Sequence, residues 1–200
     1  MGPEVRQAIA RKPSAFSTAG LGLISASSLL LVLTLTRLFA VQQFYHFAFM
    51  AISMGLLGIA ASGSLLTLWP LRWRPSLLAG GFSLTTLGAY LVINYLPFDS
   101  FAIVREPRQV LYLAFYFLAA AVPFSFSGLI VGGTLAKSGR NIHRVYGVNL
   151  LGSAIGSLAV IPALAAFGGE GTLMLAMALE MVTAVLFLPD KSPSGFRVRR

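Results

Sequence analysis

The fold follows from Ser17–Phe39, which reads STAGLGLISASSLLLVLTLTRLF and has Arg37 as its one charged residue. A helix crosses the roughly 30 Å hydrocarbon core of a bilayer with about 20 mostly apolar residues, since each residue rises about 1.5 Å. The stretch therefore predicts a transmembrane helix. A basic tail precedes it, which also suits a secretory signal peptide. The apolar run is too long for one and no small-residue cleavage site follows, so we interpret it as a retained helix.

The rest of the composition supports this interpretation. Of the 200 residues, 56% are hydrophobic and 10% are charged, whereas soluble chains carry about 25% charged residues. Disordered and nucleic-acid-binding proteins need charge and polarity along the chain, so we expect no nucleic-acid partner and a lipid bilayer instead. The chain has no cysteine, which excludes disulfides, thiolate metal sites and catalytic thiols.

Long apolar runs separated by short polar or basic loops predict an all-α, polytopic bundle of six transmembrane helices. The first run is followed by five others of sufficient length, punctuated by Trp69-Pro70, Leu96-Pro97, Gly168–Gly171 and Pro189. The predicted spans are Ser17–Phe39, Phe44–Trp69, Ser76–Leu96, Val110–Ala136, Val145–Phe167 and Thr172–Leu188.

The distribution of Lys and Arg predicts the orientation, because cytoplasmic loops carry an excess of them. A cytoplasmic N-terminus places these residues inside: Arg6, Arg11, Lys12, Arg72, Arg74, Lys137, Arg140, Arg144, Lys191, Arg197, Arg199 and Arg200. It leaves outside only Arg37, Arg105 and Arg108. We therefore expect basic cytoplasmic tails at 1–16 and 189–200, a membrane domain at 17–188, and insertion in the plasma (inner) membrane. The net charge of +9 then results mainly from the basic residues that orient the helices in the membrane.

Small residues at four-residue spacing mark candidate helix-packing faces, because close approach of backbones drives helix association in lipid. Three predicted helices carry such pairs: Gly58 with Ser62, Gly128 with Gly132, and Gly152 with Gly156. We favour packing within this chain, and the alternative is a dimer face or a moving interface.

Glu180 is the one acidic residue inside a predicted span. A charged side chain at that depth costs at least about 2.5–3.5 kcal/mol, so we expect it to face the bundle, protonated or paired. Counting from the helix ends places four hydroxyl side chains at similar depth as candidate partners: Ser27, Ser28, Thr85 and Thr86. We favour a satisfied structural carboxyl, and the alternative is a proton or cation site.

A second polar group lies near the predicted outer interface, where Arg37 ends the first span and His46 opens the second. We favour interfacial anchoring, with Arg37 reaching water. The alternative is a small site for an anion or ligand. Axial ligation of a tetrapyrrole by His46 would need a second intramembrane histidine, and His143 lies in a basic loop on the other side. We expect no cofactor.

Several strings resemble the membrane domain of the multi-pass spermidine synthase-like proteins. TRLF at Thr36–Phe39 with FYHFAFMAIS at Phe44–Ser53 is similar to their first two helices, and Pro123–Leu129 is similar to their fourth. RVYGVNLLGSAIG at Arg144–Gly156 resembles their GRLYAxDLLGAALG segment, with Asn149 in place of the usual acid. The resemblance covers most of residues 20–190.

In that family a cytoplasmic Rossmann-like aminopropyltransferase domain follows the membrane helices. This chain ends at Arg200, where that domain would begin, and no Walker loop, HExxH or strand-linked glycine fingerprint is present. We therefore expect no catalytic site in the chain. The preferred interpretation is a non-catalytic membrane subunit that positions partner proteins or forms a homodimer. The alternatives are a transporter module for amines, polyamines or a proton-coupled solute, and a membrane anchor for a separately encoded aminopropyltransferase.

Overall fold

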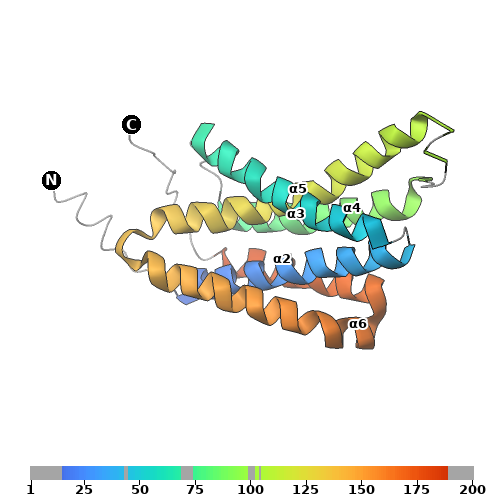
Figure 1. Ribbon diagram of the computed structural model, residues 1–200. Helices are drawn as coiled ribbons and strands as arrows, with labels where there is room; N and C mark the ends of the chain where they lie inside the picture. Colours follow the sequence, from blue (N-terminus) through green and yellow to red (C-terminus); the bar gives the residue numbers. More distant parts are fainter. Residues whose placement is uncertain (1–14, 43–44, 69–73, 99–101, 104, 189–200) are drawn as a thin grey trace.

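A computed structural model describes residues 15–42, 45–68, 74–98, 102–103 and 105–188, and every regular element in these ranges is helical. The tails predicted at 1–16 and 189–200 lie outside the described residues, apart from residues 15 and 16, which begin the first helix. The arrangement is an elongated bundle of roughly antiparallel helices (Figure 1).

Within these ranges, five helices are long and apolar enough to cross a membrane. In chain order the helices are α2 (Ala15–Gln42), α3 (Tyr45–Leu68), α4 (Pro75–Tyr95), α5 (Arg108–Lys137), the short 3₁₀ helix η1 (Gly139–Asn141) and α6 (Ile142–Leu186). The bounds of α2 to α5 agree with the first four predicted spans to within a few residues. Pro75 sits in the first turn of α4, where its missing N–H has no intrahelical acceptor to lose.

The fifth and sixth predicted spans differ from the structure, which joins them in the single helix α6 of 45 residues. A straight helix of that length would measure about 67 Å, more than twice the thickness of a bilayer core. The helix is interrupted at Gly168, where φ is 68° and ψ is −175°. Residues with a Cβ rarely adopt such a conformation, which explains the glycine. The predicted turn at 168–171 is thus confined to one residue.

Contacts with α2 show that the chain reverses direction at Gly168. Before the break, the Val148 side chain lies against Gly22, near the start of α2. At the break, Gly169 lies against Leu38, near the end of α2. After it, the ring of Phe187 returns to Gly20. The two halves of α6, residues 142–167 and 169–186, therefore run antiparallel along α2 (Figure 1).

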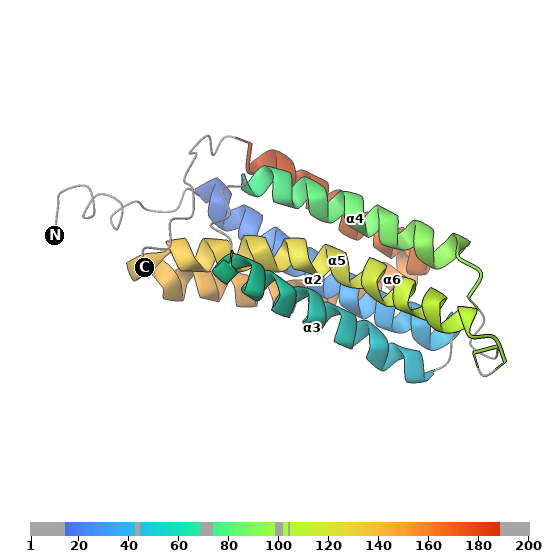
Figure 2. The same ribbon diagram turned by 90° about the horizontal axis from the view of Figure 1, so that it is seen from above.

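Helix α2 is the most buried of the five and runs through the middle of the bundle (Figure 2). It packs most extensively on α6 and also on α3, while α5 packs on both α3 and α4. The core includes Ile24, Leu31 and Phe39 of α2, Phe82 of α4 and Phe124 of α5. Helices α3 and α6 are the least buried of the five.

Candidate functional site

Glu180 lies in the second half of α6 and is fully buried, with 0% of its surface exposed. Its Oε1 accepts a hydrogen bond of 3.4 Å from the Thr86 hydroxyl of α4, which is long for an O–H donor. Its Oε2 is buried without a hydrogen-bond partner. One acidic group is therefore held in the bundle by a single weak hydrogen bond.

A second hydrogen bond joins the same two helices close to the first. The Ser83 hydroxyl of α4 donates to the Met177 carbonyl oxygen of α6, over 3.2 Å. Ser83 and Thr86 are three residues apart on α4, and so are Met177 and Glu180 on α6, so each pair shares one face of its helix. We call these two bonds the α4–α6 seam. Both donors are buried, so these bonds help to specify how α4 meets α6.

Of the four predicted partners of Glu180, only Thr86 contacts it by a hydrogen bond. Ser27 donates to Ile24 O at 3.1 Å, Thr85 to Gly81 O at 2.7 Å and Phe82 O at 3.0 Å, and Ser28 bonds to Ser127 of α5. The expectation was wrong for Ser27 and Thr85 because a helical Ser or Thr can satisfy its hydroxyl on the preceding turn of its own helix. Ser28 instead bonds to Ser127 of α5, which was not among the predicted partners.

The prediction of similar depth is nevertheless useful for Ser27. Gly20 of α2 lies against Phe187 at the end of α6. Ser27 follows Gly20 by seven residues, about two helical turns, and Glu180 precedes Phe187 by the same number. Since α2 and the second half of α6 run antiparallel, Ser27 lies at the level of Glu180 and is likewise 0% exposed.

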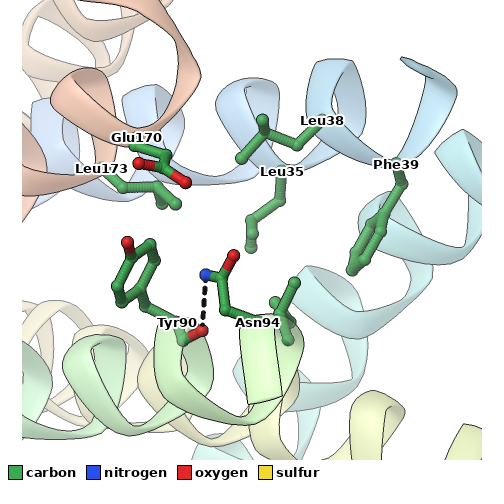
Figure 3. A pocket seen from close by; sticks show the side chains of 8 residues that line it. Leu35, Leu38, Phe39, Tyr90, Asn94, Glu170 and Leu173 are labelled. Carbon is green, nitrogen blue, oxygen red and sulfur yellow. Dashed lines mark hydrogen bonds between the residues drawn. The ribbon is translucent and has the colours of Figure 1, made fainter. Parts of the chain in front are cut away.

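A small pocket opens further along α4 and α6, near the Gly168 break (Figure 3). It is lined by Leu35, Leu38 and Phe39 of α2, Tyr90, Ile93 and Asn94 of α4, and Glu170 and Leu173 of α6. Asn94 donates from Nδ2 to the Tyr90 carbonyl oxygen at 2.9 Å, and Glu170 is exposed at the rim. The free volume is about 10 Å³, on the scale of one water molecule.

The predicted packing glycines of α6 meet the backbone of α2. A Cβ built on Gly152 would collide with the carbonyl group of Gly22, and one on Gly156 with the carbonyl group of Ala26. Both glycines are buried. Helices can approach this closely only where the facing residues are small, so these glycines determine the spacing of α2 and α6.

The other two pairs meet each other at the interface of α3 and α5. Gly128 of α5 lies against the Ser62 side chain of α3, and Gly132 against Leu66. Gly58 of α3 faces the backbone of Ala121 and Ser125. All six predicted packing residues therefore contact neighbouring helices of this chain, and no partner is needed to account for them.

The predicted outer group is only partly described. Arg37 is exposed near the end of α2, while the side chain of His46 lies outside the described residues. One polar contact that the sequence reasoning missed is the hydrogen bond from Ser25 Oγ to Asn149 Oδ1, at 2.7 Å, between α2 and α6. The sequence signal for this contact is Asn149 itself, an amide side chain within a mostly apolar span.

The described residues form a helical membrane protein in which Glu180 is a buried carboxyl. Among the described residues, no group of three or more His, Cys, Asp or Glu side chains could hold a metal ion. In comparisons with known proteins, no family model, no curated protein and no solved structure matches the chain.

Proposed function

We propose that the chain is a non-catalytic integral membrane subunit that packs against other membrane proteins and positions them within an assembly. The observation that carries the proposal is an uncovered face of α3, formed by Ser53, Leu57, Ala60, Ser64 and Thr67, all exposed. Their alternating spacing of four and three residues places them on one side of the helix and is typical of helix–helix contact surfaces. We call this set the open face of α3.

The chemistry of the open face suits a helix better than lipid. Four of its five residues are small or carry a hydroxyl, which is typical of transmembrane helix interfaces. Its hydroxyls are satisfied on their own helix, as in the bond from Ser53 to Phe49 O at 3.0 Å, so a partner can approach without leaving them unpaired. The exposed side of α3 also carries large apolar side chains beside the open face, at Phe49, Ile52, Leu56, Ile59 and Leu68.

The proposal includes six spans, with the halves of α6 as separate crossings and both termini cytoplasmic. The reversal at Gly168 supports the count, and the contact between Gly20 and Phe187 supports termini on one side. The excess of Lys and Arg assigns that side to the cytoplasm, and we propose the plasma membrane. Descent from the membrane domain of spermidine synthase-like proteins rests on the sequence strings alone.

Transport of a small solute is the second candidate, and Glu180 is the observation that favours it. A buried carboxyl with an unpartnered oxygen is a common element of proton and cation pathways. The pocket of Figure 3 has room for about one water molecule, so it does not itself accommodate an amine or a polyamine.

The test is to purify the chain from its native membrane in mild detergent and identify the proteins that come with it. Ala60→Leu places a bulky side chain on the open face of α3, and Ala114→Leu makes the same change at an exposed position of α5. We expect Ala60→Leu to lose the co-purifying protein, or the homodimer, while Ala114→Leu retains it and both variants stay folded. Equal retention by the two variants would refute the open face as the contact.

A further inference from the structure

We propose that Glu180 is a proton-binding site: its side chain is a neutral carboxylic acid, with the proton on Oε2, and this proton exchanges with water through motions of the bundle. The proposal goes beyond the function proposed above, because it holds for a structural subunit and for a transporter alike. It is carried by the geometry of the α4–α6 seam.

The first argument is the absence of a compensating positive charge near Glu180 in the described part of the chain. The helices packed against α6 are α2, α4 and α5. The described residues of α2 carry one charged side chain, Arg37, which is exposed, and the one buried titratable group on the three helices is Tyr116. Its hydroxyl donates to Ile93 O and Leu96 O, at the far end of α4.

The remaining titratable side chains on these elements lie away from Glu180. Tyr90 lines the pocket near Gly168 together with Glu170, and Tyr112 lies one turn before Tyr116 in α5. The others are exposed near helix ends: Arg74, Tyr95, Arg108, Lys137, Arg140, His143, Arg144 and Tyr146. An ionised Glu180 would thus be a buried charge without a counter-charge, which proteins avoid by neutralising the group.

The second argument is the hydrogen-bond pattern of the carboxyl group. Thr86 donates to Oε1, which suits the carbonyl oxygen of a neutral acid. Oε2 receives no donor, so a carboxylate would leave negative charge on an unsolvated oxygen. A protonated Oε2 leaves only one neutral O–H group without an acceptor, which costs less free energy than a buried unpaired charge.

A bound monovalent cation is the competing occupant, and the seam suits it less well. Such an ion needs several converging oxygen atoms. The hydroxyls at this level are committed elsewhere, Ser83 to Met177 O and Ser27 to Ile24 O, which leaves Thr86 as the one hydroxyl bonded to the carboxyl among the described residues.

Infrared difference spectroscopy of the protein in lipid vesicles tests the proposal directly. The wild-type spectrum minus that of Glu180→Gln, at neutral pH, is expected to show the C=O stretch of a protonated acid, and this band should shift in D₂O because the proton exchanges. A carboxylate band in its place would overturn the proposal. So would loss of the acid band on adding Na⁺ at constant pH, since that result identifies a cation site. An acid band that does not shift in D₂O would overturn the claim of exchange.

A measurement on the wild type alone covers the case in which Glu180→Gln does not fold. Dicyclohexylcarbodiimide is an apolar reagent that adds the O–H of a carboxylic acid across one of its C=N bonds, with the proton going to nitrogen and the carboxyl oxygen to carbon. Peptide mapping should find the adduct on Glu180 and not on exposed Glu170, whereas a water-soluble carbodiimide should give the reverse. Labelling of Glu170 alone by both reagents would contradict the proposal.

Discussion

The contact between α2 and the first half of α6 can be tested by adding a single methyl group. Gly156→Ala places a Cβ against the backbone of Ala26, with the Ala26 C and Cα atoms 2.7 Å away. Real Cβ atoms do not approach backbone so closely, and a backbone cannot rotate away as a side chain can, so α2 and α6 must separate. Over-packing of this kind costs about 1–3 kcal/mol.

The same substitution also has a favourable effect, which must be separated from the clash. Replacing Gly by Ala inside a helix gains about 0.5–1 kcal/mol from lower backbone entropy in the unfolded chain. Gly147→Ala isolates this gain, because a Cβ at Gly147, on the same helix, meets no atom within 4 Å. We therefore expect Gly147→Ala to be neutral or stabilised, and Gly156→Ala to be less stable than Gly147→Ala by about 1–3 kcal/mol.

The assay is unfolding of the purified protein in mixed micelles by increasing mole fractions of SDS, with Gly152→Ala as a second test residue. Gly152 faces the Gly22 backbone in the same way, so its loss should match that of Gly156→Ala. Equal stability of Gly156→Ala, Gly152→Ala and Gly147→Ala would refute the close approach of α2 and α6.

Three further predictions follow from the proposed topology and chemistry. Because the chain has no cysteine, single-cysteine variants at Ser192 and Ser100 show on which side of the membrane each position lies. We expect an impermeant maleimide added to intact cells to label position 100. Labelling of position 192 would exclude cytoplasmic termini. The purified chain should form no spermidine from putrescine and decarboxylated S-adenosylmethionine, since it carries no nucleotide-binding motif; measurable product would contradict this. Glu180→Gln should assemble normally, because Gln has nearly the same size and keeps an acceptor for Thr86; if assembly is normal and a solute uptake is lost, transport replaces the subunit as the better proposal.

The sequence was a good guide to the helices and to their packing motifs. Apolar runs and proline punctuation placed α2 to α5 to within a few residues, because the thickness of the bilayer imposes span length. The four-residue spacing of Gly152 and Gly156 marked residues that the structure places against α2, since that spacing puts both on one helix face.

Hydrogen-bond partners and exposed faces were harder to obtain from the sequence. Depth counting placed Ser27 and Thr86 near Glu180, but it could not tell which hydroxyl points across an interface and which bonds to its own helix. The open face of α3 could not be predicted either, because both sides of this helix carry small residues. Gly58 and Ser62 lie on the side that packs against α5, opposite the open face. Rotation of a helix about its axis depends on the whole bundle.

The two halves of α6 are held by different interactions, which leads to a last prediction. The first half approaches the α2 backbone through glycines, whereas the second half meets α4 through the α4–α6 seam. Glu180→Leu removes the acceptor of Thr86 alone, because Ser27, Ser28 and Thr85 bond elsewhere. Since a helical Thr can turn its hydroxyl to the preceding turn, the loss should fall near the lower end of about 1–3 kcal/mol. Glu180→Leu combined with Thr86→Val leaves no orphaned group and should recover stability in the SDS assay. A double variant less stable than Glu180→Leu would show that the Thr86 hydroxyl has another essential partner.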